Sequence, residues 1–119
     1  MIFEALFSVL IMLESSGNDK AYHKVTKATG CVQITQVVLD DVNETYHTHY
    51  TRKDCYNRQK SKDICYKYLK RHNALNSYEN AARTWRGGPD GKRRGYVNVY
   101  WNKARILLVK RGVASGKKN

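Results

Sequence analysis

The segment from Met1 to Leu13 constrains the fold more than any other part of the chain, because apolar side chains occupy nearly all of its positions. A helix without a polar face is stable only when other helices enclose it. The segment also carries Glu4, has no basic start and no cleavage site of small residues, and is too short to cross a bilayer. We therefore predict a buried helix over residues 2–14 of the mature domain, with no export signal and no membrane span.

The rest of the chain indicates further helices, because apolar residues recur at intervals of three and four. We expect them over about residues 36–46, 58–72, 77–85 and 97–110, with polar or glycine-rich loops at 18–30 and 90–95. Asn57 and Ser77 are suitable N-caps, and Gly87-Gly88-Pro89 is expected to end the fourth helix. The prediction is a mainly α fold of about five helices around the buried first helix. One domain would span residues 1–111, followed by a basic, flexible tail over 112–119.

The size of the chain, 119 residues, suits one domain, and its formal charge of +12 predicts attraction to polyanions. Nucleic acid, anionic lipid and the acidic polymers of a bacterial envelope all fit that description. Lysines alternate with tyrosines between residues 54 and 71, which is more typical of a solvated helix face than of a helix that reads nucleic acid. We therefore expect no specific nucleic-acid partner.

Cysteines and histidines offer little support for a metal site. The chain has three cysteines, an odd number, and no Cys-x-x-Cys pair: Cys31, Cys55 and Cys65. This pattern implies neither a disulfide framework nor a four-ligand zinc site. Reduced, buried thiols are the simplest interpretation, and one bridge with a free thiol stays open. His47 and His49 lie near several aspartates, but side chains two residues apart diverge at a helix end. We predict no metal and no cofactor.

Glu14 ends the predicted first helix, where it could act as a general acid. Cleavage of a glycosidic bond needs a carboxyl group that is still protonated near neutral pH. At this position apolar surroundings and the negative end of the helix dipole both disfavour the carboxylate, and so raise the pKa of Glu14. The alternative is an ordinary exposed glutamate at a helix end, and position alone does not decide between the two.

Three motifs follow one another along the chain: Glu14-Ser15-Ser16-Gly17-Asn18, then Gly30-Cys31-Val32-Gln33-Ile34, then Ala82 to Gly91 followed by Tyr100-Trp101-Asn102-Lys103. In this order and spacing they resemble the signatures of goose-type lysozymes and soluble lytic transglycosylases. The resemblance covers most of the chain, from Glu14 to about Leu108, and the third motif is also similar to runs in small phage-encoded lysins. Arg86 departs from the pattern, because the family usually has Asn there, and so does Cys31-Val32, which replaces Leu-Met.

The resemblance implies a lysozyme-like domain with Glu14 as its catalytic acid. It also implies a substrate-binding groove formed by Ser15, Gly30, Gln33, Ile34, Trp85, Arg86, Gly87 and Tyr100. Other readings stay open for some of these residues. Ser15 could pack behind Glu14, Gly30 could serve only its turn, Gln33 could cap the next helix, and Trp85 could belong to the core.

The expected activity is that of a muramidase that cleaves the MurNAc–GlcNAc bond of peptidoglycan, either as a lysozyme or as a lytic transglycosylase. The second route needs only one glutamate, and the sequence favours it slightly because no aspartate has a compelling position as a base. We expect a monomer of phage origin that acts on the bacterial cell wall, released from the host cytoplasm or carried in a virion. The alternative is a non-catalytic glycan-binding or virion-structural domain in which Arg86 or Cys31 spoils the groove.

Overall fold

The computed structural model describes residues 1–113, and residues 114–119 of the predicted tail lie outside the described part. The described residues form five α-helices and one 3-10 helix: α1 (Phe3–Ser15), α2 (Gln36–Tyr46), η1 (Lys53–Tyr56), α3 (Arg58–Arg71), α4 (Tyr78–Gly91) and α5 (Gly95–Lys110). The predicted mainly α fold is confirmed. Within residues 1–113 no helix is long and apolar enough to cross a membrane.

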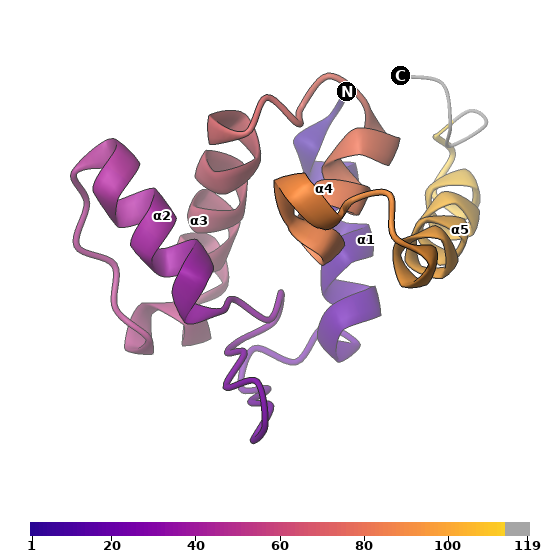
Figure 1. Cartoon of the computed structure of the whole chain (residues 1–119). Coiled ribbons are helices and arrows are strands. Elements are labelled where there is room, and N and C mark those ends of the chain that lie inside the picture. The colour runs from indigo at the N-terminus through magenta and orange to yellow at the C-terminus, as the bar shows by residue number, and fades with distance from the viewer. Residues whose placement is uncertain (114–119) are drawn as a thin grey trace.

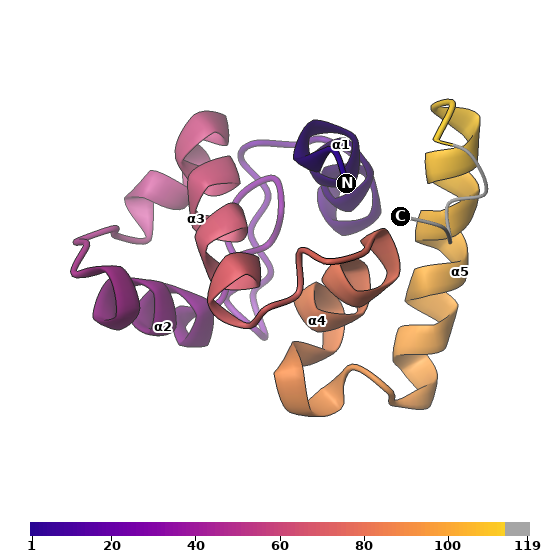
Figure 2. The ribbon, with the colours of Figure 1, turned by 90° about the horizontal axis from the view of Figure 1, so that it is seen from above.

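The first helix lies between α3 and α5, with α4 packed beside it (Figures 1 and 2). Helix α2 packs against α3, α4 packs against α5 and α3, and α1 contacts both α4 and α5. Leu6, Val9 and Leu10 of α1 have no solvent exposure, which fits the predicted buried helix. Enclosure is incomplete at its ends, since Ile2 is 66% and Met12 43% exposed.

The two predicted N-caps are present. The side chain of Asn57 accepts a hydrogen bond from the backbone N–H of Lys60 at the start of α3. The side chain of Ser77 accepts one from the N–H of Asn80 at the start of α4. These contacts satisfy donors that the first turn of a helix leaves without an internal partner.

The fourth helix differs from its prediction at the C-terminal end. Its backbone leaves the helical region at Gly88, with φ 77° and ψ 170°, as the Gly-Gly-Pro sequence indicates. A further helical turn then follows as far as Gly91, because the fixed φ of Pro89 suits the first position of a new turn. The predicted loop over 90–95 is therefore shorter, and α5 already begins at Gly95.

Two details of the central region were wrong or missed. The apolar spacing of the second helix places Val37 on its buried face together with Val38 and Val42, but Val37 is 74% exposed, and Val38, Leu39 and Val42 form that face. The short 3-10 helix η1 was not predicted, because a single turn gives no periodic pattern to detect. It matters for the site, since the loop that leads to α2 packs against it.

Candidate active site

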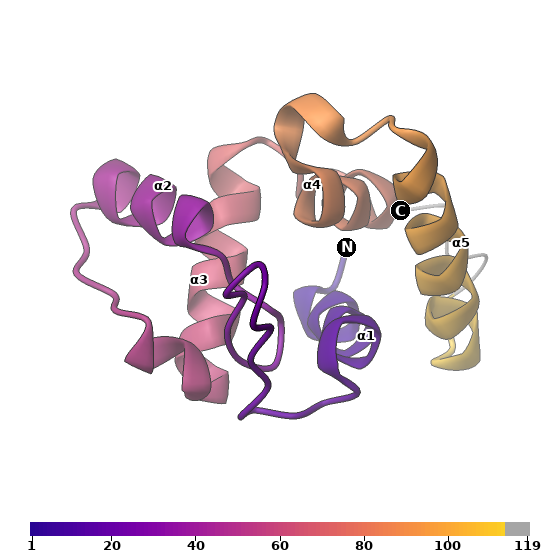
Figure 3. The ribbon, with the colours of Figure 1, turned by 60° about the horizontal axis from the view of Figure 1, so that its bottom comes forward.

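A groove of about 540 Å³ opens where the end of α1, the loop after it, the end of α4 and the first half of α5 meet. Figure 3 shows this loop, residues 18–35, running between α1 and α3. The groove is lined by Leu13, Glu14, His23, Thr26, Ala28, Gln33, Thr35, Trp85, Arg86, Tyr96, Val99, Tyr100 and Lys103. Parts far apart in the sequence thus meet around one glutamate.

Glu14 is the next-to-last residue of α1 and is partly buried. The hydroxyl of Tyr100 donates a hydrogen bond of 2.9 Å to its Oε2. No hydrogen bond from any described residue reaches Oε1. Because Oε2 is held as an acceptor, the proton of the neutral carboxylic acid belongs on Oε1, which remains available to a ligand in the groove.

Burial raises the pKa of Glu14 above its ordinary value, while the hydrogen bond from Tyr100 and the positive charge of Arg86 act in the opposite direction. The pKa of Tyr100 is itself raised well above its usual range, by burial first and then by the charge of Glu14. Tyr100 therefore stays protonated and keeps donating. The result is an oriented carboxyl group with an increased tendency to hold a proton, as a general acid requires.

Glu14 is the only carboxyl group among the described residues that line the groove. Four aspartates that could in principle act as a base, Asp19, Asp40, Asp41 and Asp54, have contacts outside the groove. Asp19 pairs with Arg58 at 2.8 Å, and Asp54 with Lys60 at 3.0 Å. Asp40 accepts a hydrogen bond from Gln36, and Asp41 contacts Arg71 and His72. In the part of the chain that the structure describes, the groove therefore has one acid and no second carboxylate beside it.

The loop that forms one wall of the groove is anchored by Gly30, whose φ is +86°. A Cβ added there would lie 1.7 Å from the carbonyl oxygen of Cys55 in η1, so only glycine allows this approach. The N–H of Gly30 also donates to the carbonyl of Ala21 at 2.8 Å. Gly30 therefore positions the wall and is not among the residues that line the groove.

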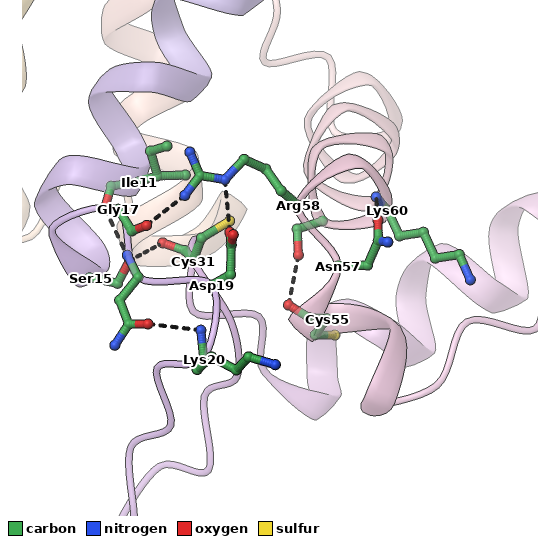
Figure 4. Close-up of polar contacts among 12 residues, drawn as sticks. Ile11, Ser15, Gly17, Asp19, Lys20, Cys31, Cys55, Asn57, Arg58 and Lys60 are labelled. Carbon is green, nitrogen blue, oxygen red and sulfur yellow. Dashed lines mark hydrogen bonds and ion pairs between the residues drawn. The ribbon is translucent and has the colours of Figure 1, made fainter.

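Figure 4 shows the polar contacts that tie this loop to α1 and α3. Ser15 donates a hydrogen bond from its hydroxyl to the carbonyl of Cys31 at 2.7 Å. Arg58 donates to the carboxylate of Asp19 at 2.8 Å and to the carbonyl of Gly17 at 2.5 Å. Ser15 thus holds the loop to the end of α1 and is not among the residues that line the groove.

Gln33 reaches the groove from a strained backbone. Its φ of 60° is in the left-handed region, which costs about 1 kcal/mol or more for a residue other than glycine. The side-chain amide donates to the carbonyl of Gly30 at 3.1 Å, which fixes its direction. The strain is located at a residue that faces the ligand space, where such backbone conformations often occur.

Trp85 belongs both to the core and to the groove edge. Its indole N–H donates to the carbonyl of Val32 at 3.2 Å, and its ring meets that of Tyr68 edge-on at 5.7 Å between centroids. Only 9% of the residue is exposed. The core interpretation and the aromatic-wall interpretation are therefore compatible.

Four of the eight residues expected to bind substrate line the groove with Glu14: Gln33, Trp85, Arg86 and Tyr100. The other four do not line the groove but support the segments that form it. Ser15 and Gly30 anchor the loop as described, and Ile34 is fully buried in the core. A Cβ at Gly87 would lie 2.8 Å from Val97, so this glycine lets α4 and α5 approach.

Several residues of the groove were missed by sequence reasoning. Three of them lie on α5 on the same face as Tyr100: Tyr96, Val99 and Lys103. Residues three or four positions apart share one face of a helix, so the assignment of Tyr100 to the groove could have indicated them. His23 and Thr26 lie in the aperiodic loop, where no pattern marks them.

Within residues 1–113, no three histidine, cysteine or acidic side chains come close enough together to hold a metal ion. The three cysteines are buried and free.

Comparison with protein-family models matches residues 1–107 to the transglycosylase SLT domain. No curated protein and no solved structure gives a match. The match begins before Glu14 and ends after Lys103, so it includes every residue that lines the groove. The similarity to phage-encoded lysins and the phage origin stay predictions.

Proposed function

This chain belongs to the transglycosylase SLT domain family, whose members act on peptidoglycan, and we propose that it is a lytic transglycosylase with Glu14 as its only catalytic carboxyl group. The bond cleaved would be the one between MurNAc and GlcNAc. The observation that carries the proposal is the carboxyl group of Glu14, partly buried, oriented by Tyr100 and alone in the groove among the described residues.

The reaction would use Glu14 twice. As an acid, Glu14 gives its proton to the glycosidic oxygen, so that the bond from this oxygen to C1 of the muramic acid residue breaks and GlcNAc leaves with a free 4-hydroxyl. As a base, the carboxylate then takes the proton of the 6-hydroxyl of the same muramic acid residue. The 6-oxygen bonds to C1 and closes a 1,6-anhydro ring, which leaves Glu14 protonated for the next cycle.

The surroundings of Glu14 suit both steps. Burial favours the neutral acid needed first, while the hydrogen bond from Tyr100 and the charge of Arg86 stabilise the carboxylate formed after proton transfer. A hydrolase of the inverting type would need a second carboxylate about 6.5 to 9.5 Å from the first, to activate water. The groove offers no such group among the described residues, which favours the single-glutamate route.

The proposal is tested by the release of soluble glycan from purified peptidoglycan. Glu14→Gln keeps the shape and polarity of the side chain but cannot give up a proton, so we expect release to fall at least about a hundredfold. Glu44→Gln is the matched control, because Glu44 is an exposed carboxyl of α2 outside the groove. Equal release by the wild type and Glu14→Gln would contradict the proposal. No release by the wild type from several wall types would favour the non-catalytic glycan-binding alternative.

A further inference from the structure

Two cationic side chains lie in the groove beside Glu14. Arg86 comes from α4 and Lys103 from α5, and both line the groove with Glu14. No hydrogen bond or ion pair to either side chain occurs within residues 1–113. Among the described residues, the groove thus contains two cationic side chains without an ion-pair partner and one carboxyl group whose pKa is raised by burial.

The guanidinium of Arg86, an exposed residue, lies close to two aromatic rings. The centre of its guanidinium lies 5.7 Å from the ring centroid of Tyr96 and 5.8 Å from that of Tyr100, so two rings of α5 bear on one cation. Contacts of this kind orient a guanidinium and leave its N–H donors unused. Five donors in a planar fork match the two oxygens of a carboxylate. An oriented guanidinium with free donors at a ligand groove is a ready anion site.

We propose that Arg86, assisted by Lys103, forms a carboxylate-binding site that reads the acidic group of the muramic acid residue next to the bond that is cleaved. The inference rests on the proposed function for the substrate class. Two sources carry that chemistry in peptidoglycan: the lactyl carboxylate where no peptide is attached, and a carboxylate of the stem peptide where one is. GlcNAc has neither, so the site distinguishes the two sugars of the strand.

Binding of such a carboxylate has a consequence for Glu14. In the free protein the positive charge of Arg86 favours the ionised form of Glu14. A ligand carboxylate on Arg86 offsets that charge and adds a negative one nearby, so the pKa of Glu14 rises and the acid keeps its proton. The other groups around Glu14 do not reverse this upward change in its pKa. Tyr100 of α5 and Cys65 of α3 are neutral, with pKa values raised well above their ordinary ones, and His23 and Lys103 line the groove as further basic groups.

The test compares four small probes by NMR titration of the full chain: MurNAc, its lactyl amide, GlcNAc and a muramyl dipeptide with a free carboxylate. We expect at least one carboxylate-bearing probe to bind about fivefold more tightly than GlcNAc and the amide, the scale of a partly exposed charged contact. Tighter binding of MurNAc identifies the lactyl carboxylate. Tighter binding of the dipeptide alone identifies the stem peptide.

Three variants connect the preference to its residue. Arg86→Gln is expected to remove the preference without changing the affinity for GlcNAc, and Arg86→Lys to retain part of it, since it keeps the charge but not the fork. Arg93→Gln removes an equal charge outside the groove and is expected to change nothing. In the wild type, MurNAc or the dipeptide should also raise the pKa of Glu14 followed through its carboxyl carbon, and this rise should be absent in Arg86→Gln.

Equal binding of all four probes, or a preference that survives Arg86→Gln, would overturn the inference. Its failure is separable from that of the proposed function. Glutamate-dependent release of glycan together with equal probe binding would leave the transglycosylase standing and remove the carboxylate site. Carboxylate-selective binding without Glu14-dependent release would do the reverse.

Discussion

Replacing Gly30 by alanine tests whether the loop wall of the groove is held by close contact with η1. Gly30 and Gly17 have nearly equal backbone conformations in φ, +86° and +82°. At either position, an alanine would have to adopt the left-handed backbone conformation, which costs about 1 to 2 kcal/mol. At Gly17 the nearest heavy atoms to an added Cβ are 4.0 Å away, which is ordinary contact. At Gly30 the Cβ would lie 1.7 Å from the oxygen and 2.8 Å from the carbon of the Cys55 carbonyl.

Gly30→Ala must therefore displace backbone, and the cost of such overpacking is typically about 1 to 3 kcal/mol. We expect Gly17→Ala to lower the free energy of unfolding by about 1 to 2 kcal/mol and Gly30→Ala by about 2 to 5 kcal/mol. Equilibrium denaturation with guanidinium measures both on the same scale. Failure of Gly30→Ala to fold while Gly17→Ala folds agrees with the reasoning. Equal destabilisation of the two variants would refute it.

Three further predictions concern single groups. Tyr100→Phe removes a hydrogen bond that stabilises the ionised form of Glu14, so the pKa of Glu14 should rise. Because activity needs the protonated acid, the alkaline limb of the pH–activity profile should move to higher pH. A move to lower pH would contradict the assignment. Trp85→Phe leaves the buried carbonyl of Val32 without its indole donor, so unfolding should become easier by about 1 to 3 kcal/mol, as measured by denaturation. Burial raises the pKa of Cys55 to about 11 and also raises the pKa of Cys31 and Cys65. All three thiols should therefore resist alkylation at neutral pH until the protein is denatured, and rapid labelling of the native protein would count against the buried arrangement.

Helix positions were predictable because their signals are local. Apolar spacing, the N-caps Asn57 and Ser77, and the Gly-Gly-Pro break at Gly88 all act within a few residues of the structure that they determine. The additional turn after Pro89 shows the limit of this reasoning. A proline both ends one helix and can begin the next, and the sequence does not say which event dominates.

The groove was predictable only in part, because its shape depends on contacts between distant segments. The approach of Gly30 to Cys55 and the bond from Ser15 to Cys31 involve loops without periodicity, and no local pattern announces them. Glu14 and Tyr100 are separated by 86 positions, and only the resemblance placed both at the site. Arg86 departs from the family pattern, and its proximity to Tyr96 and Tyr100 depends on the packing of α4 against α5, which no local pattern predicts.

The central claim is that Glu14 serves as both acid and base in one groove. Mass spectrometry of the fragments released from purified peptidoglycan tests it most directly, with Glu14→Gln treated in parallel. The account predicts fragments that end in 1,6-anhydro-muramic acid from the wild type and none from the variant. Reducing muramic acid ends would instead show that water attacks C1 with the help of a base outside the groove lining, and anhydro ends from Glu14→Gln would remove Glu14 from the chemistry.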